Sequence, residues 1–182
     1  MLKEESKLHI RPFKNITPNI HDSVYVDPAA VIIGDVSIGA DSSIWPCTVI
    51  RGDVNNIVIG ARTNIQDGCV LHVTHKNEKN KNGYALILGD EVTVGHGVIL
   101  HGCTIQSLCL IGMGVIIMDG AIVNSQTYVG AGSLVPPNAI LDSGYLWLGS
   151  PVKKIRPLTA EEIAFLPYTA GQYVNLKNEY IK

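Results

Sequence analysis

The sequence lacks an excess of charge of either sign and lacks a long apolar run. Its 14 Lys and Arg residues are balanced by 16 Asp and Glu residues, which leaves a net charge of −2. This balance provides no basic surface for nucleic acid. The longest apolar run, Leu108–Met118, is about half of what a membrane-spanning helix needs and contains two glycines. We therefore expect no nucleic acid and no membrane among the partners.

Cysteine is also scarce, and no apolar leader is visible. The four cysteines, at positions 47, 69, 103 and 109, have no CxxC spacing and predict no disulfide framework. The segment Met1–Phe13 is charged and has no apolar core of a signal peptide, so the expected location is the cytoplasm. With 182 residues, the chain is long enough for a single domain with a sizeable core.

What the sequence does have is an apolar residue at every sixth position, here called an anchor. The anchors form four runs: Ile32, Ile38, Ile44 and Ile50; Ile59, Ile65 and Leu71; Leu88, Val94 and Leu100; and Ile111, Ile117, Val123, Val129 and Val135. This hexapeptide period predicts a parallel β-helix, in which three hexads make one coil of a triangular prism. The alternative, a sandwich of alternating strands, would show a period of two with irregular turns.

The β-helix is expected to cover residues 12–150. The repeat should end at Pro136–Pro137, and the segment Tyr145–Pro151 should close the prism. Thr159 and Glu162 have the spacing of a capping box, which predicts a helix over residues 159–182. The helix carries an apolar stripe at close to helical spacing, which predicts packing along the prism. Its members are Ile163, Leu166, Ala170, Tyr173 or Val174, and Leu176.

Three histidines follow anchors, and the faces of the prism decide which of them can share a metal ion. His72 and His101 directly follow anchors of one face, one coil apart, if His75–Tyr84 is an excursion. Coils stack at about 4.8 Å, which suits two imidazoles on one ion with bonds of about 2.0–2.1 Å. A lone histidine is more often a surface or packed residue. Two in register, with His96 on the adjacent face, favour a metal site.

His96 predicts that the site is shared between subunits. It stands two positions after an anchor of another face, so it points away from His72 and His101. As a ligand it would serve a neighbouring chain, and threefold closure would give a homotrimer with three identical interfacial sites. Imidazole ligands suit Zn²⁺ and also tolerate Fe²⁺ or Co²⁺.

Further polar residues extend both faces. The nine-residue step Ile50–Ile59 predicts a three-residue bulge, which places Arg51 beneath His72 and Asp53 at the next corner. This pair would be a solvated corner ion pair of little energetic weight, or a desolvated and specific contact at a trimer interface. One face then presents Arg51, His72 and His101, and the opposing face presents Gln66, Asp67 and His96.

The chain resembles the γ-class carbonic anhydrases and their short bacterial relatives in four segments: Arg51-Gly52-Asp53, Asn64-Ile65-Gln66-Asp67-Gly68, Leu71-His72, and Gly95-His96 to His101-Gly102. The resemblance runs from about Pro12 to the C-terminus. It implies a left-handed parallel β-helix that forms a trimer with zinc or iron between subunits. It further implies that His72 and His101 bind the metal from one chain and His96 from the next. In that family the Arg51–Asp53 pair joins subunits, and Gln66 orders the metal-bound water.

Two positions depart from the founding member of that family. Val54 stands where an acid follows the aspartate, and His75 stands where a glutamate shuttles protons. The loop that carries His75 is short. Tyr173 matches a tyrosine that reaches toward the metal pocket in the shorter relatives; the alternative is that it only packs in the helix stripe.

Three functions remain open at this point. The first is reversible hydration of CO₂ to bicarbonate: zinc lowers the pKa of its water from about 15.7 to about 7, and the hydroxide attacks CO₂. Gln66 would orient that hydroxide, and His75 can carry the released proton. The second is acyl transfer or thioester hydrolysis; plain hexapeptide acyltransferases need no metal, but a zinc-dependent thioesterase stays open. The third is a non-catalytic assembly subunit with a structural metal. The fold alone cannot choose among them.

Overall fold

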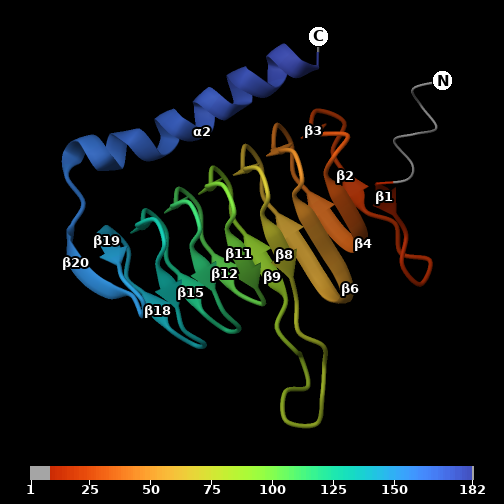
Figure 1. Cartoon of the computed structure of the whole chain (residues 1–182), viewed down its shortest axis with the longest axis horizontal. Helices are drawn as coiled ribbons and strands as arrows, with labels where there is room; N and C mark the ends of the chain where they lie inside the picture. Colours follow the sequence, from red (N-terminus) through yellow and green to blue (C-terminus); the bar gives the residue numbers. More distant parts are fainter. Residues whose placement is uncertain (1–8, 182) are drawn as a thin grey trace.

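The structure, a computed structural model, describes residues 9–181 and consists of stacked parallel strands with one long helix beside them (Figure 1). The parallel β-helix expected from the hexapeptide period is confirmed. Each strand pairs with the strand one coil earlier and one coil later, because every coil repeats the same three short strands and turns. No helix within residues 9–181 is long and apolar enough to cross a membrane.

The strands form three faces, here called A, B and C. Face A contains β1 (Ile10–Arg11), the first half of β4 (Val31–Ile38) and of β6 (Val49–Ile59), β8 (Val70–His72), β11 (Ile99–His101), β14 (Ile116–Ile117) and β17 (Leu134–Val135). Face B contains β2 (Asn19–Ile20), the second halves of β4 and β6, β9 (Leu86–Leu88), β12 (Thr104–Ile105), β15 (Ile122–Val123) and β18 (Ile140–Leu141). Face C contains β3 (Tyr25–Val26), β5 (Ser43–Ile44), β7 (Asn64–Ile65), β10 (Thr93–Val94), β13 (Leu110–Ile111), β16 (Tyr128–Val129) and β19 (Tyr145–Leu148).

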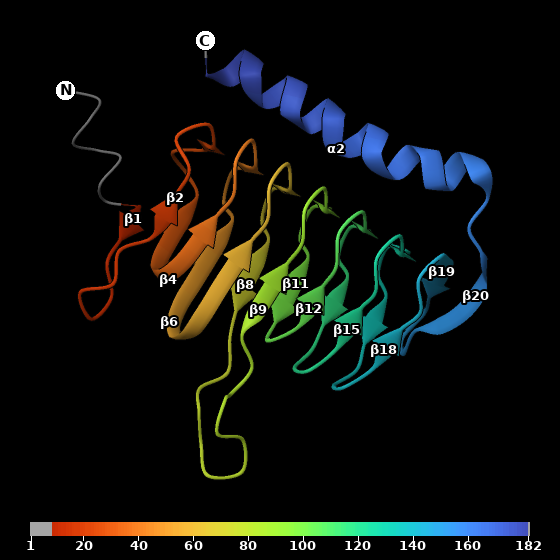
Figure 2. The same ribbon diagram turned by 180° about the vertical axis from the view of Figure 1, so that it is seen from behind.

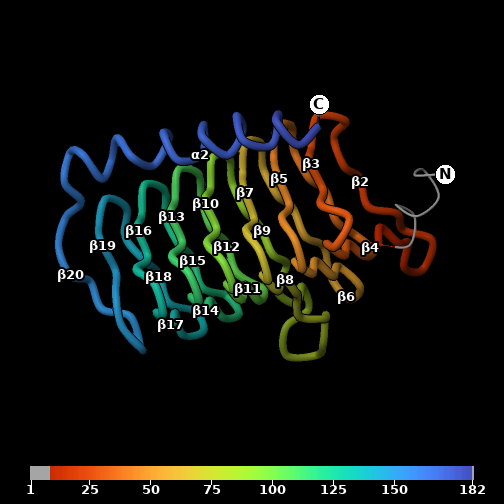
Figure 3. Tube along the Cα trace, turned by 45° about the horizontal axis from the view of Figure 1, so that its top comes forward, coloured from red at the N-terminus to blue at the C-terminus, as the bar shows by residue number. Residues whose placement is uncertain are grey.

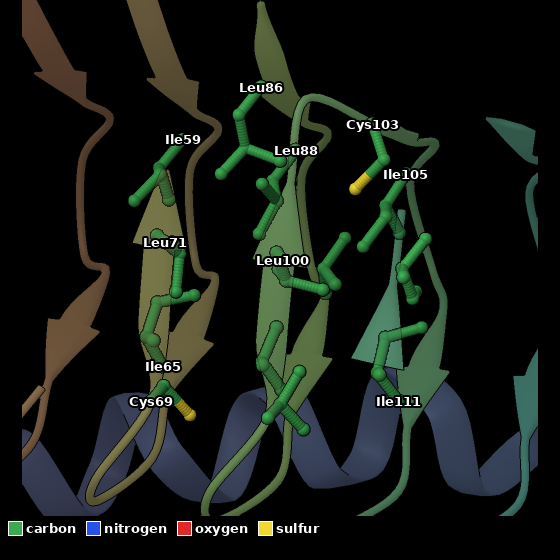
Figure 4. Close-up of a cluster of buried hydrophobic side chains, with 14 of the residues drawn as sticks. Ile59, Ile65, Cys69, Leu71, Leu86, Leu88, Leu100, Cys103, Ile105 and Ile111 are labelled. Atoms are coloured by element: carbon green, nitrogen blue, oxygen red, sulfur yellow. The ribbon is translucent and has the colours of Figure 1, made fainter. Parts of the chain in front are cut away.

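The anchors fill the inside of the prism. Ile50, Leu71 and Leu100 pair in sequence across face A and are completely buried. Figure 4 shows how anchors from the three faces meet in the centre, with Cys69 and Cys103 among them. Burial raises the pKa of the Cys69 thiol to about 11, which keeps it protonated. All four cysteines are free thiols, as the absence of a CxxC spacing predicted.

The expectation that the repeat ends at Pro136–Pro137 is wrong. Leu141 and Trp147 continue the six-residue spacing after Val135, and β18 and β19 pair with the coil before them. The two prolines lie in the turn between β17 and β18, where the chain needs no strand hydrogen bond. The solenoid ends when β20 (Lys153–Pro157) folds back antiparallel to β19.

The C-terminal helix, α2 (Ala160–Tyr180), runs back along face C toward β3 (Figures 2 and 3). Thr159 is its N-cap, and the expected capping box with Glu162 is present. The helix continues through Pro167 without a break.

The expected apolar stripe of α2 needs a correction. Leu166 and Ala170 are buried as expected. Ile163 and Leu176 are 40% and 43% exposed, and Lys177 is buried instead. The helical period explains this, because residues 166, 170 and 177 share one side of the helix and residue 176 does not. The Lys177 ammonium ends 3.1 Å from the Asp41 carboxylate at the rim of face C.

Beyond β8 the chain leaves the solenoid in a loop and returns at β9. Thr74 and Tyr84 close this loop with an antiparallel bridge, and the loop projects away from the stacked strands (Figures 1 and 2). The structure therefore contains the excursion that the sequence required between His75 and Tyr84.

Candidate metal centre

Two histidines end neighbouring strands of face A. His72 is the last residue of β8 and His101 is the last residue of β11, and their Cα atoms are partners in the strand pairing. His72 Nδ1 lies 3.0 Å from His101 Nε2. The hexad count predicted this stacking. The count holds only because the loop after β8 is an insertion and not a further coil of the β-helix.

The facing nitrogens fit two positions of a tetrahedral metal site. Two nitrogens bound at about 2.0–2.1 Å to a tetrahedral ion lie about 3.3–3.4 Å apart. The 3.0 Å separation of His72 Nδ1 and His101 Nε2 is within a few tenths of an ångström of that value. A small opening of the pair would admit an ion, so the residues present are suited to a bound metal.

The outer nitrogen of each ring is held by a carboxylate. His72 Nε2 lies 3.0 Å from Asp53 Oδ1, and His101 Nδ1 lies 2.7 Å from Asp119 Oδ1. A carboxylate on the outer nitrogen fixes the ring orientation and leaves the inner nitrogen free as a ligand. Face A thus carries two imidazoles that are oriented so that both could bind one metal ion from the same side.

Asp53 also accepts a hydrogen bond from Arg51, so one carboxylate serves both the cation and the imidazole. Burial alone would raise the pKa of Asp53, but the hydrogen bonds from Arg51 and His72 outweigh it and lower the pKa below its usual value. The Arg51 side chain is 43% exposed in the single chain. The guanidinium is therefore partly accessible on the surface of the single chain.

The third histidine lies at the corner between faces C and A. His96 follows β10 and stands just before Gly97, whose positive φ of 67° turns the chain toward face A. Its Nδ1 lies 3.0 Å from Asp67 Oδ2, one coil earlier at the same corner. None of the hydrogen bonds of His96 goes to the histidine pair on face A.

Gln66 and Tyr173 belong to the side of His96. Gln66 is buried on face C, and its Nε2 donates to Asn64 Oδ1 at 3.1 Å. Tyr173, on α2, packs its ring edge-on against Trp45, with the centroids 5.8 Å apart. Burial, and then the negative charge of Asp67, raise the pKa of the Tyr173 hydroxyl. Tyr173 therefore packs in the helix stripe and also lies in the field of Asp67.

The single chain thus carries two half-sites. The face A half-site consists of Arg51, Asp53, His72, His101 and Asp119, and the corner half-site consists of Gln66, Asp67, His96 and Tyr173. Within residues 9–181, no three His, Cys, Asp or Glu side chains are arranged to hold a metal ion. Within residues 9–181 of one chain, no hydrogen bond joins the face A half-site to the corner half-site.

Comparisons with known proteins identify the family. Residues 17–52 match the family described as bacterial transferase hexapeptide (six repeats). The chain is 58% identical over 172 residues to the protein YrdA of Escherichia coli, with 94% of each chain covered. It is 44% identical to a carbonic anhydrase of Geobacillus kaustophilus, over 95% of this chain and 91% of that one. It is 47% identical to the mitochondrial γ carbonic anhydrase 2 of Arabidopsis thaliana, over 88% of this chain and 57% of that longer protein. The chain belongs to the γ-class carbonic anhydrase family.

A solved structure extends the comparison to the fold. The hexapeptide transferase family protein of Anaplasma phagocytophilum is 39% identical, with a TM-score of 0.86 over 94% of this chain and 97% of that one. Relatives of this γ-class chain are therefore described in two ways, as carbonic anhydrases and as a transferase family protein.

Within residues 9–181 of this γ-class chain, the His75 side chain makes no hydrogen bond or ion pair with either half-site. It is exposed in the loop after β8, one residue beyond Thr74. Its exposure is compatible with exchange of protons with the solvent, and its position near the end of β8 keeps it on the side of the face A half-site.

Sequence reasoning missed Asp119 in this γ-class chain. Asp119 follows β14 at the corner of faces A and B, one coil beyond His101. The signal was available, because Ile117 is the face A anchor that stacks on Leu100, and Asp119 stands two positions after it.

Proposed function

We propose that the protein catalyses the reversible hydration of CO₂ to bicarbonate at metal sites shared between the subunits of a homotrimer. The observation that carries this proposal is the pair of facing nitrogens of His72 and His101, each ring held from behind by a carboxylate. The relatives named as carbonic anhydrases support the same chemistry.

The exposed apolar residues of face A support the homotrimer. Val70, Ile99 and Ile116 stack on consecutive strands beside the histidines and are 42%, 40% and 38% exposed in the single chain. A contiguous apolar column beside polar groups is typical of a protein interface. If face A packs against the corner of the next chain, this column is buried and the two half-sites meet, and threefold rotation repeats the contact.

Two groups of residues would form the metal site, one that binds the ion and one that orients the binding imidazoles. His72 and His101 would hold the ion from one subunit and His96 from the next; zinc, once bound, would supply a Lewis acid that makes water a nucleophile near neutral pH. Asp53, Asp119 and Asp67 orient the three imidazoles.

The remaining predicted residues act on water and protons. Gln66 would hold the attacking water in position through its amide, which Asn64 already orients. The exposed imidazole of His75 would carry the released proton to buffer, since histidine titrates near neutrality. Tyr173 would close the pocket from the side of α2. We propose zinc as the metal, with Fe²⁺ or Co²⁺ as ions that the same imidazoles accept.

Acyl transfer, or hydrolysis of an acyl thioester, is the second candidate. It is favoured by one observation, the 39% identity and common fold shared with a protein described as a hexapeptide transferase family member. The same half-sites would then activate water against a thioester carbonyl.

The decisive experiment measures metal content and CO₂ hydration together. Protein purified without chelator should contain about one metal per chain, and stopped-flow CO₂ hydration should disappear on chelation and return with zinc. His72→Ala should abolish both. His21→Ala removes an exposed imidazole whose hydrogen bonds within residues 9–181 go to Ser23, and it should leave both unchanged. A panel of acyl-CoA substrates is assayed beside CO₂. Metal-loaded trimer without CO₂ hydration would refute the proposal, and thioester turnover would then support the second candidate.

A further inference from the structure

Asp119 uses both carboxylate oxygens, and the two partners come from different parts of the chain. Oδ1 accepts the Nδ1–H of His101 at 2.7 Å, and Oδ2 accepts the hydroxyl of Thr74 at 2.7 Å. The Asp119 side chain is 29% exposed, so both hydrogen bonds are partly protected from water.

Thr74 lies at the base of the loop that leaves the solenoid after β8. Its backbone is fixed by two hydrogen bonds with Tyr84, each 3.0 Å long, which close the loop. The side chain of Thr74 is therefore held by the closing bridge, and Asp119 connects that bridge to His101. Figures 1 and 2 show the loop leaving between β8 and β9, next to β11, which carries His101.

We propose that Asp119 is a positioning residue for the metal ligand His101, and that Thr74 holds Asp119 so that the base of the loop supports the metal site. This inference rests on the proposed metal site. A neutral imidazole carries one proton, and a carboxylate at Nδ1 keeps that proton on Nδ1 and leaves the lone pair of Nε2 free. His101 Nε2 is the atom that faces His72.

The role of Thr74 follows from the rotational freedom of the Asp119 carboxylate. A carboxylate held at one oxygen can turn about its last side-chain bond, and the imidazole would turn with it. The hydroxyl of Thr74 fixes the second oxygen, so the plane of the Asp119 carboxylate and the ring of His101 are set together. Ligands that are preorganised in this way bind a metal more tightly, because less freedom is lost on binding.

The chain offers a matched control in the same loop. The Tyr84 hydroxyl reaches Asn138 Oδ1 at 3.5 Å, at the same corner as Asp119 and one coil later. Within residues 9–181 it makes no hydrogen bond with a histidine. Tyr84→Phe therefore removes a hydrogen bond between the loop and the solenoid, and it leaves the hydrogen bonds from Thr74 to Asp119 and from His101 to Asp119 in place.

The experiment uses full-length protein labelled with ¹⁵N-histidine, with the wild type compared with Asp119→Ala, Asp119→Asn, Thr74→Val and Tyr84→Phe. The first readout is the slowly exchanging Nδ1–H signal of His101 in metal-free protein, assigned by its absence in His101→Gln. The second readout is the zinc dissociation constant, measured by competition with a chromophoric chelator. Thermal unfolding of each metal-free variant reports whether the fold is intact.

We expect Asp119→Ala to lose the Nδ1–H signal and to weaken zinc binding by about 10–100-fold. Thr74→Val should keep the signal, broadened, and weaken zinc binding by a smaller factor, while Tyr84→Phe should bind zinc like the wild type. If Asp119→Ala does not fold, Asp119→Asn keeps the shape of the side chain and should weaken zinc binding because an amide supports the imidazole less than a carboxylate does.

Wild-type zinc affinity in folded Asp119→Ala or Asp119→Asn would overturn the inference, as would equal losses in Thr74→Val and Tyr84→Phe. Failure of the proposed function is a separate result. If the wild type bound no zinc, the metal site would be refuted, and loss or survival of the His101 Nδ1–H signal in Asp119→Ala would still decide whether Asp119 positions the ring.

Discussion

The division of the ligands between two half-sites can be tested by mixing inactive variants. His96→Ala removes the proposed ligand of the corner half-site, and His101→Ala removes a proposed ligand of the face A half-site. A homotrimer of either variant has every site short of one histidine, so both should lack bound zinc and CO₂ hydration. The two variants are denatured, mixed in equal amounts and refolded together.

The expected recovery follows from the order of chains around the threefold axis. A site is complete only where a chain that kept His101 meets a neighbour that kept His96. In every mixed trimer this happens once, so about one third of its sites are complete, and random mixing makes about three quarters of the trimers mixed. Zinc content and activity should therefore return to about one quarter of the wild-type value.

The matched control mixes His72→Ala with His101→Ala. Both histidines lie on neighbouring strands of the same chain, so every site of a mixed trimer still lacks one of them, and mixing should restore nothing. A charge tag on one variant allows ion exchange to show that mixed trimers form. The reasoning is refuted if the two mixtures recover equally, or if the first recovers nothing although mixed trimers are present.

Three further outcomes are expected. His75→Ala should lower the turnover rate at low buffer concentration, and added imidazole buffer should restore it, while kcat/KM changes little. A fall in kcat/KM that imidazole does not restore would indicate that the loop with His75 covers the site instead. Leu166→Ala should lower the free energy of unfolding in urea by about 2–4 kcal/mol, whereas Leu176→Ala, at a position 43% exposed, should change it little; equal losses would contradict the corrected helix face. The hydrogen bonds from Arg156 and from the N-cap backbone lower the pKa of Glu162 to about 2, so the stabilisation is present above about pH 4.5 and is lost as the pH falls through about 2. Urea titrations should therefore show Glu162→Gln less stable than the wild type at neutral pH and equal to it near pH 2, and a constant difference would contradict this assignment.

The arrangement of the site could largely be predicted because the repeat converts sequence position into place on the prism. Once Leu71 and Leu100 are assigned to one face, His72 and His101 must stack, and His96 must point from another side. The excursion between β8 and β9 did not disturb this count, because it leaves and rejoins the solenoid at the same corner.

The parts that could not be predicted are those where no period constrains a side chain. The hydrogen bonds of Asp119 depend on how far a short side chain reaches at a corner, and sequence spacing does not encode this distance. Lys177 occupies a buried helix position because its long apolar stem carries the charge out to Asp41, a possibility that an apolar pattern overlooks. The end of the repeat is also not predictable from its two adjacent prolines, because a corner between strands accommodates them without a strand hydrogen bond.

The position of the histidines within the stack determines when thermal unfolding reaches them. In a solenoid each coil is stabilised by its two neighbours, so melting begins at the ends and advances inward one coil at a time. On face A, β8 and β11 lie between β6 on one side and β14 and β17 on the other. Fraying at either end must therefore melt whole coils before it reaches His72 and His101. We expect the arrangement of this histidine pair to outlast the first losses of secondary structure.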